Sequence, residues 1–195
     1  MLKMSDTETY IPTSLPEKLD ELNIYKKNFN FYEKYHKNLY NKIVHIICIP
    51  NIVSSIFGLL NHFEYLLFAT SKNILSSGLF GTYMFTYMIF APPRIVKRTF
   101  FFYLFILLTT NRFYNEMDHK TSLRVFLAIQ VLGWMGQILS HKYLEKNSPA
   151  FMKGAVQSFV TGPIFIVDEI MRFIPLFRFW PLSVSYFIYL MRVKN

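Results

Sequence analysis

A chain of 195 residues is long enough for one domain. Hydrophobic residues make up 52% of it and charged residues only 17%, whereas a soluble domain carries about 25% charged residues. Long apolar runs after residue 43 account for the difference, so the composition favours a membrane protein over a soluble globular one. The net charge of +9 can indicate nucleic-acid binding. The lysines and arginines lie mostly between the apolar runs, however, which fits anionic lipid headgroups and predicts no nucleic-acid partner.

The N-terminal region differs in composition from the rest of the chain. Residues 1–22 are polar, contain Pro12 and Pro16, and are predicted to form a disordered or loosely attached tail. Residues 23–195 are predicted to form a single helical membrane domain. Within it, residues 23–42 alternate basic and aromatic side chains, as in a helix lying at the level of the lipid headgroups. The same pattern suits an amphipathic helix that packs on the rest of the protein.

Six apolar runs are separated by short polar or proline-containing stretches. They predict an all-α fold, a polytopic membrane helical bundle with about 4–6 transmembrane helices. Pro50 in the first run predicts a kink or a break. The third run is short for a span, which needs about 20 residues, unless it begins near Ile95. The runs cover residues 43–60, 74–90, 100–110, 123–140, 154–173 and 180–191.

The basic residues predict how these helices are oriented. Short basic segments collect on the cytosolic side, and the N-terminal region and the turn at 94–98 are the most basic. Two spans separate them, so both fall on that side, and four spans bring the chain back to it if the third run crosses. This topology places His36, His45, His141 and Glu145 at one cytosolic face, although about 100 residues separate the first two from the last two.

Two histidines and two asparagines lie where the polar N-terminal region meets the first apolar run. His45 follows Asn41 by four residues, so both share one helix face. His36 precedes His45 by nine residues, which would place it on the opposite side of a continuous helix at about 100° per residue. Both histidines can reach one metal only if the chain bends between them, and Asn38 or Asn41 is a suitable helix cap for that bend.

A second polar cluster ends the fourth run, where Gln137, His141 and Glu145 step by four and line one stripe. The single cysteine, Cys48, excludes a cysteine-rich metal site, so histidine and carboxylate ligands remain. Such ligands suit ferrous iron with positions left open for oxygen and substrate, and neighbouring amides or carboxylates orient the imidazoles. The alternative interpretation is that these side chains are interfacial polar residues without a metal.

Further ionisable residues lie outside the two clusters. Asp168 and Glu169 fall within the fifth run, where charged groups are costly and often functional. For Asp168 we favour a position near the far membrane interface, with Arg172 as a partner for either acid, and we leave the role of Glu169 open. His62 and His119 are predicted to lie in solvated loops on the face opposite the histidine clusters.

The two clusters together resemble the pattern of a known family, the membrane 2-hydroxy fatty acid dioxygenases of the yeast phytosphingosine-degradation type, long carried as a domain of unknown function. The family pattern runs Tyr-His-x4-Asn-x3-His-x3-Ile/Val-Pro and then Trp-x2-Gln-x2-Gly-His-x3-Glu-x3-Pro-Ala. The resemblance covers roughly residues 28–190, and Ser140 replaces the usual glycine. The matching residues are Tyr35, His36, Asn41, His45, Ile49, Pro50, Trp134, Gln137, His141, Glu145, Pro149 and Ala150, with Gln157, Pro163 and Glu169 at further family positions.

This resemblance implies a multi-pass endoplasmic reticulum enzyme that requires Fe(II), with its site and termini facing the cytosol. It implies α-oxidation of 2-hydroxy long-chain fatty acids by O2, releasing CO2 and the acid one carbon shorter, in sphingoid base and fatty acid catabolism. By the same resemblance His36, His45 and His141 would bind the metal. Glu145 would be a fourth ligand or a neighbour that orients a ligand, and Asn41 and Gln137 would belong to the same catalytic site.

Two other classes of function compete with this hypothesis. A non-catalytic membrane lipid-binding or scaffold protein would carry the histidines as interfacial residues and hold no iron. A small transporter would place ionisable residues near the middle of the membrane, and only Asp168 and Glu169 come near that position. The metal content of the purified protein discriminates the enzyme from the scaffold.

Overall fold

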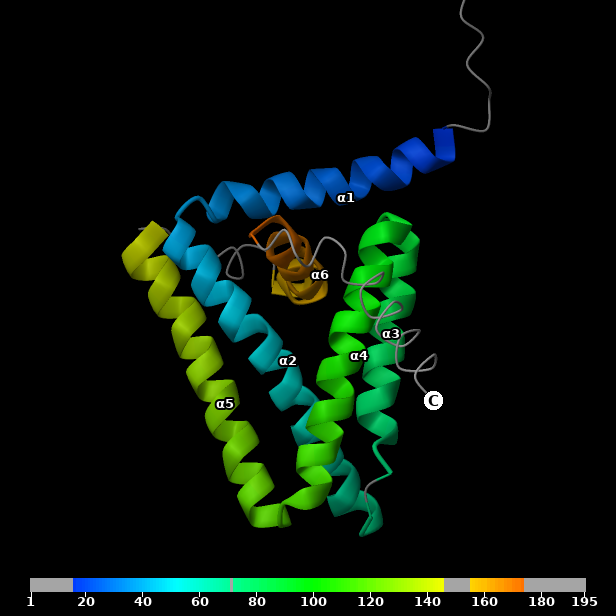
Figure 1. Ribbon diagram of the computed structural model, residues 1–195, viewed down its shortest axis with the longest axis vertical. Helices are drawn as coiled ribbons and strands as arrows, with labels where there is room; N and C mark the ends of the chain where they lie inside the picture. The colour runs from blue at the N-terminus through cyan, green and yellow to red at the C-terminus, as the bar shows by residue number, and fades with distance from the viewer. Residues whose placement is uncertain (1–15, 71, 146–154, 174–195) are drawn as a thin grey trace, which may run out of the picture.

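The computed structural model describes residues 16–70, 72–145 and 155–173, and all secondary structure in these ranges is helical (Figure 1). The all-α prediction is confirmed. The segment expected as a sixth span, residues 180–191, lies outside the described residues. The elements are α1 (Pro16–Tyr35), α2 (Leu39–Phe68), α3 (Ile74–Phe90), α4 (Pro93–Glu116), α5 (His119–Ser140), the π-helical turn η1 (His141–Glu145) and α6 (Ala155–Phe173).

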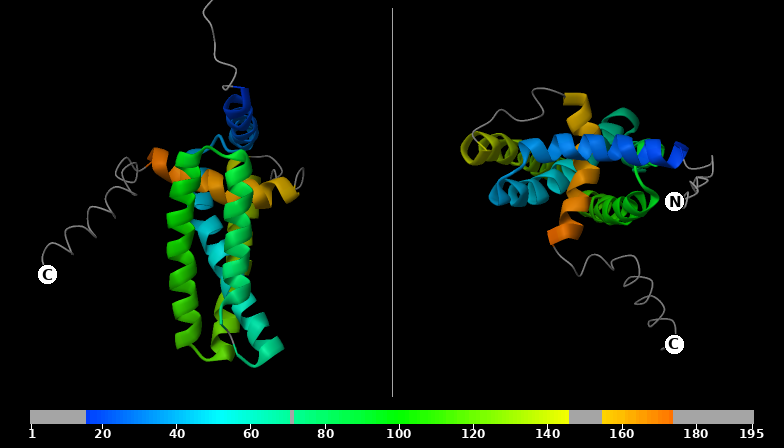
Figure 2. Two further views of the ribbon diagram at one scale, coloured as in Figure 1. Left: turned by 90° about the vertical axis from the view of Figure 1, so that its right-hand side faces the viewer. Right: turned by 90° about the horizontal axis from the view of Figure 1, so that it is seen from above.

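Helices α2 to α5 run along the long axis of the molecule and alternate in direction, while α1 and α6 lie across one end (Figures 1 and 2). The third apolar run is longer than expected, because it belongs to α4, a helix of 24 residues. At about 1.5 Å per residue α4 extends over about 36 Å. It therefore carries the chain back along the bundle, so that the start of α2 and the end of α5 meet beside α1.

Small residues bring α2 and α5 close together, and this is the most extensive helix pair in the described fold. A Cβ atom at Gly133 would lie 2.6 Å from Cγ1 of Ile52, and one at Gly136 would lie 2.7 Å from Sγ of Cys48. Both positions therefore need glycine for the observed spacing. α2 remains helical through Pro50, so the proline does not break it.

Two described helices are long and apolar enough to cross a membrane, judged by length and composition: Leu39–Phe68 and His119–Glu145. α6 was expected as a fifth span but lies across the end of the bundle (Figure 2). A bundle with about 4–6 spans remains a prediction. The orientation of α6 does not support the expectation that this helix is the fifth span. Exposed apolar side chains on α2 to α5 include Ile43, Ile47, Phe85, Met88, Phe105, Leu108, Leu132 and Ile138.

α1 begins at Pro16, inside the stretch expected to be a loose tail. Its inner face packs on α6: the rings of Tyr25, Phe29 and Tyr32 all contact the ring of Phe165, with centroids 5.3–5.5 Å apart. Tyr25, Phe29 and Tyr32 of the 23–42 segment thus pack on the protein, as one of the two interpretations expected. The outer face of α1 exposes Lys26, Lys27 and Lys34.

The far end of the bundle corrects the prediction for His62. α2 continues to Phe68 and buries the His62 side chain, which was expected in a solvated loop. His119 is the first residue of α5 and is half-buried, with its ring stacked on that of Tyr65 at 3.5 Å between centroids.

Polar groups at this end of the bundle bond to one another. The Glu64 carboxylate accepts hydrogen bonds from the backbone N–H groups of Lys72 (2.7 Å) and Leu75 (3.1 Å), which closes the turn into α3.

Candidate metal centre

Three histidines from distant parts of the sequence meet at the α1 end of the bundle. His36 follows α1, His45 lies on the second turn of α2, and His141 begins η1. Their ring centroids are 4.5–4.8 Å apart. All three side chains are buried, with 2–4% of their surface exposed. The prediction that the two sequence clusters lie close together in space is confirmed. His36, His45 and His141 are called the histidine cluster below.

The bend that the sequence required between His36 and His45 is present. α1 ends at Tyr35, residues 36–38 are not helical, and Asn38 is the N-cap of α2. The Asn38 side-chain oxygen accepts hydrogen bonds from the backbone N–H groups of Tyr40 (2.8 Å) and Asn41 (3.4 Å). This capping satisfies two donors that an α-helix leaves open at its start. It also turns the chain so that His36 faces the same point as His45.

Backbone carbonyls determine which imidazole nitrogens of His36 and His45 are protonated. Nδ1 of His36 lies 2.7 Å from the Tyr32 carbonyl oxygen, and Nδ1 of His45 lies 2.9 Å from that of Asn41. A carbonyl oxygen can only accept, so Nδ1 donates in both residues. In a neutral imidazole Nε2 then keeps its lone pair, and a hydrogen bond from Nδ1 to a carbonyl is the usual support of a metal-binding histidine.

His141 faces this pair from a local distortion of the α5 helix. Its backbone N–H bonds to the carbonyls of Gln137 and Ile138, and the next residues form the π-helical turn η1. Such turns are rare and often occur at functional sites. Nε2 of His141 lies 3.1 Å from Nε2 of His45, and Nδ1 of His141 is buried without a hydrogen-bond partner.

The donor set fits a metal ion. His45 offers a lone pair at Nε2, so the His141 nitrogen 3.1 Å away must either donate a proton to it or share a cation with it. Two nitrogens at that separation, each about 2.1 Å from one ion, subtend roughly a right angle. All three histidines offer a ring nitrogen within 4.8 Å of the others. Three neutral nitrogen donors on one side of a site leave positions open on the other side.

Burial keeps His36 neutral. It lowers the pKa of this imidazole to about 3, against the hydrogen bond to the Tyr32 carbonyl, while His141 and Lys42 add smaller effects in the lowering direction. The ring of Tyr32 stacks on that of His36 with centroids 3.9 Å apart and shields it from solvent. An imidazole that is neutral at pH 7 offers its lone pair without first losing a proton.

Glu145 and Asn41 connect the two halves of the histidine cluster. Oε1 of Glu145 accepts hydrogen bonds from the backbone N–H of Asn38 (2.8 Å) and from Nδ2 of Asn41 (3.0 Å). These bonds tie the end of η1 to the start of α2, more than 100 residues earlier in the chain. Asn41 is fully buried, and its backbone carbonyl holds His45. Of the two roles considered for Glu145, these contacts favour that of a neighbour which orients the ligands.

Two acidic residues of α6 lie at the histidine end of the bundle, not at the far interface as expected for Asp168. Asp168 does pair with Arg172 at 3.2 Å, and Arg172 also contacts Glu33 at 3.2 Å. Glu169 is only 2% exposed and pairs with Lys42 at 2.9 Å. The hydropathy pattern gave no signal for this contact, because it depends on α6 lying across the bundle.

The histidine cluster forms part of the wall of a cavity of about 410 Å³ between α1, α2, α5 and α6. Gln137 also lines this cavity; its side chain is buried, and its Nε2 has no hydrogen-bond partner. Sequence reasoning placed Gln137 in the site, but composition alone could not separate a ligand tunnel lined by aromatic residues from ordinary core packing. The apolar lining of the cavity includes Phe31, Ile49, Ile52, Trp134, Ile138 and Phe165.

These features define an all-helical protein with a buried three-histidine cluster at the end of an apolar cavity. A family model described as "2-hydroxy-palmitic acid dioxygenase Mpo1-like" matches residues 22–174, and the chain belongs to this family. The chain is also 28% identical over 144 residues to the 2-hydroxy-palmitic acid dioxygenase MPO1 of Saccharomyces cerevisiae, covering 74% of this chain and 78% of the relative. No solved structure matches the chain.

Proposed function

We propose that this protein is an Fe(II)-dependent dioxygenase that shortens 2-hydroxy long-chain fatty acids by one carbon. The observation that carries the proposal is the buried histidine cluster in the wall of an apolar cavity. Family membership and the name of the yeast relative support the same reaction class. His36, His45 and His141 would hold the iron, which when bound supplies a Lewis acid for a chelating 2-hydroxy carboxylate and a site for O2.

The reaction balances without an external reductant. A 2-hydroxy acid and O2 give the acid one carbon shorter, CO2 and water. The bond between the carboxyl carbon and C2 breaks, and C2 becomes the new carboxyl carbon. The substrate loses four electrons, and O2 takes up four. The proposal therefore needs no flavin, nicotinamide or electron-transfer partner.

The protein side chains would bind and orient the substrate. Gln137 has an unpaired amide donor beside His141, suited to a carboxylate or hydroxyl oxygen of the substrate head. The apolar walls would hold the acyl chain and exclude water from the head. Glu145 and Asn41 would keep the bend before α2 and the end of α5 together, and so keep His36, His45 and His141 at one point.

We also propose that the protein is a multi-pass protein of the endoplasmic reticulum membrane whose histidine end faces the cytosol. Two apolar helices of sufficient length and the exposed apolar side chains of the bundle support a bilayer location. The basic residues support the orientation, because Lys26, Lys27 and Lys34 on α1 and Arg94 and Lys97 on α4 are exposed at the histidine end. The carboxylate of a 2-hydroxy acid in the cytosolic leaflet would lie at the same depth as the histidine end of the protein.

The test is product analysis with the detergent-purified protein, Fe(II) and 2-hydroxypalmitate under air. We expect mass spectrometry to find the acid one carbon shorter together with CO2, and both to disappear when a chelator is added. An anaerobic sample is the matched control, because the balanced reaction consumes O2. Iron bound through His36 without this product would show that the substrate is wrong. Neither iron nor product would favour a non-catalytic lipid-binding or scaffold protein.

A further inference from the structure

The cavity beside the histidine cluster, called the acyl cavity below, extends along α2. Along α2 the residues that line it are His45, Ile49, Ile52, Val53 and Ile56, which follow one another on successive turns. At about 1.5 Å per residue, the distance from His45 to Ile56 is about 16 Å. An acyl chain whose head lies at the histidine cluster would therefore extend along α2 towards Ile56, away from α1.

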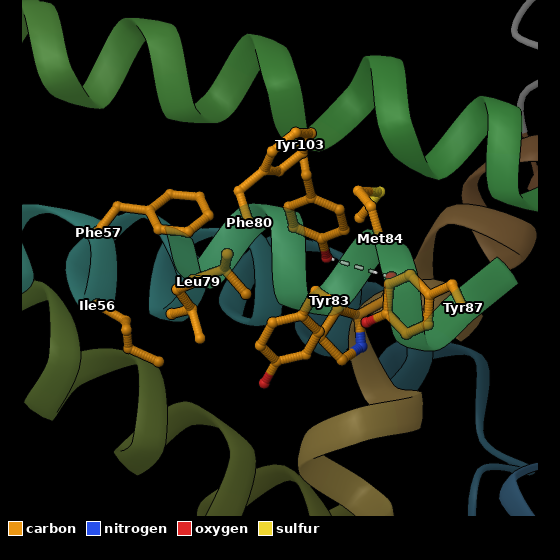
Figure 3. A pocket seen from close by; sticks show the side chains of 10 residues that line it. Ile56, Phe57, Leu79, Phe80, Tyr83, Met84, Tyr87 and Tyr103 are labelled. Carbon is orange, nitrogen blue, oxygen red and sulfur yellow. Dashed lines mark hydrogen bonds between the residues drawn. The ribbon is translucent and has the colours of Figure 1, made fainter. Parts of the chain in front are cut away.

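A second, smaller cavity of about 30 Å³ lies between α2, α3, α4 and α6 (Figure 3). Its lining is apolar and aromatic, and four residues line both cavities. The two spaces are thus neighbours separated by a few side chains. The shared residues are Val53, Ile56, Tyr83 and Pro163.

Tyr83 has the largest side chain of these four residues. It belongs to α3 and lines both cavities, and its hydroxyl donates a hydrogen bond to the Phe159 carbonyl of α6 at 3.3 Å. This bond joins α3 to α6 beside the larger cavity, which both residues line. The nearby Tyr103 hydroxyl bonds to the Pro163 carbonyl at 3.2 Å, so α6 is held on this side by α4 as well (Figure 3).

We propose that Tyr83 is a specificity-determining residue that closes the acyl cavity and limits the length of the fatty acid that binds. The inference rests on the proposed function, because it takes the occupant to be the acyl chain of a 2-hydroxy acid. Removal of the ring joins the larger cavity to the smaller one and leaves space for additional methylene groups. One methylene in a hydrophobic pocket is worth about tenfold or more in discrimination.

The experiment measures the binding of 2-hydroxy fatty acids of graded chain length to metal-free protein, by displacement of a fluorescent fatty acid. Turnover of the same series is measured in parallel with the iron-loaded protein. Tyr83→Ala should move the preference to longer chains, by about tenfold in the ratio of long to short. Tyr83→Phe keeps the ring and should retain the wild-type optimum. Phe85→Ala is the matched control, because Phe85 lies on the same helix but is 63% exposed.

Ile56→Phe tests the same idea in the opposite direction and does not depend on the folding of Tyr83→Ala. It enlarges a side chain at the distal end and should shift the preference to shorter chains. An unchanged length profile in both Tyr83→Ala and Ile56→Phe would overturn the inference. If the binding profiles shift as expected but the wild type turns over no 2-hydroxy acid, the cavity assignment stands and the proposed function fails.

Discussion

The two ends of the bundle both bury a histidine, and they differ in what surrounds it. At the α1 end, Nδ1 of His36 and of His45 bonds to a backbone carbonyl, and Nε2 of His45 comes within 3.1 Å of His141. At the far end, His62 and His119 are 6.5 Å apart between ring centroids, and the Tyr65 ring covers His119. Burial of a histidine alone is therefore weak evidence for a metal. The stronger evidence is that ring nitrogens with free lone pairs point to one place while the other ring nitrogen is held by a backbone carbonyl.

Removing a histidine from the cluster should have the largest effect. His141→Ala deletes one of three proposed ligands and should abolish turnover of 2-hydroxypalmitate, while the protein still inserts into membranes. His119→Ala, at the far end of the same helix, should retain activity. Product formation by both variants in the same membranes is the measurement. Wild-type turnover by His141→Ala would contradict the assignment.

Glu145 and Glu64 form a second matched pair, since each accepts hydrogen bonds at a turn into a helix. Glu145→Ala leaves the Asn38 N–H and the Asn41 amide without their acceptor, and iron affinity should fall by about 10–100-fold. Glu64→Ala removes the acceptor at the start of α3. It should destabilise the fold by about 1–3 kcal/mol and leave iron affinity in the folded protein unchanged. Iron titration and thermal unfolding of both variants separate an effect on the metal from an effect on the fold. Equal iron affinities of Glu145→Ala and Glu64→Ala would refute the proposed role of Glu145.

The glycine seam between α2 and α5 should matter more than glycines that face open space. Gly133→Ala puts a Cβ 2.6 Å from Cγ1 of Ile52, whose branched side chain relaxes poorly, and should cost about 1–3 kcal/mol. No heavy atom lies within 4 Å of a Cβ at Gly81. Gly81→Ala should stabilise α3 by about 0.5–1 kcal/mol. Unfolding midpoints in denaturant test whether the two substitutions change stability in opposite directions. A stabilising Gly133→Ala would disprove close packing between α2 and α5.

The smallest expected effect near neutral pH is a pH dependence that involves the α1 end. The pKa of His36 is about 3 in the folded, metal-free protein, against about 6.5 in an unfolded chain. Between these values the unfolded chain binds more protons, so acid should destabilise the fold progressively from about pH 6.5 downwards. His36→Gln removes this contribution and should flatten the curve of melting temperature against pH. An identical slope in the variant would show that folding does not lower the pKa of His36.

The sequence predicted the histidine cluster better than it predicted the fold around it. The bend at Asn38 and the end of α3 at Phe90 follow from local chemistry, that is, a side-chain cap and two prolines. α6 could not be placed, because its hydropathy does not distinguish a helix that crosses a membrane from one that lies across a bundle. The pairing of Glu169 with Lys42 and the burial of His62 depend on tertiary packing, which spacing along the chain does not encode.

The most direct test is the iron content of purified protein loaded with Fe(II) and freed of excess metal. We predict stoichiometric iron in the wild type and in His62→Ala and His119→Ala. We predict its loss in His36→Ala, His45→Ala and His141→Ala, each confirmed as folded by circular dichroism. Iron retained in all three cluster variants, or lost equally in the far-end variants, would contradict a metal centre at the histidine cluster.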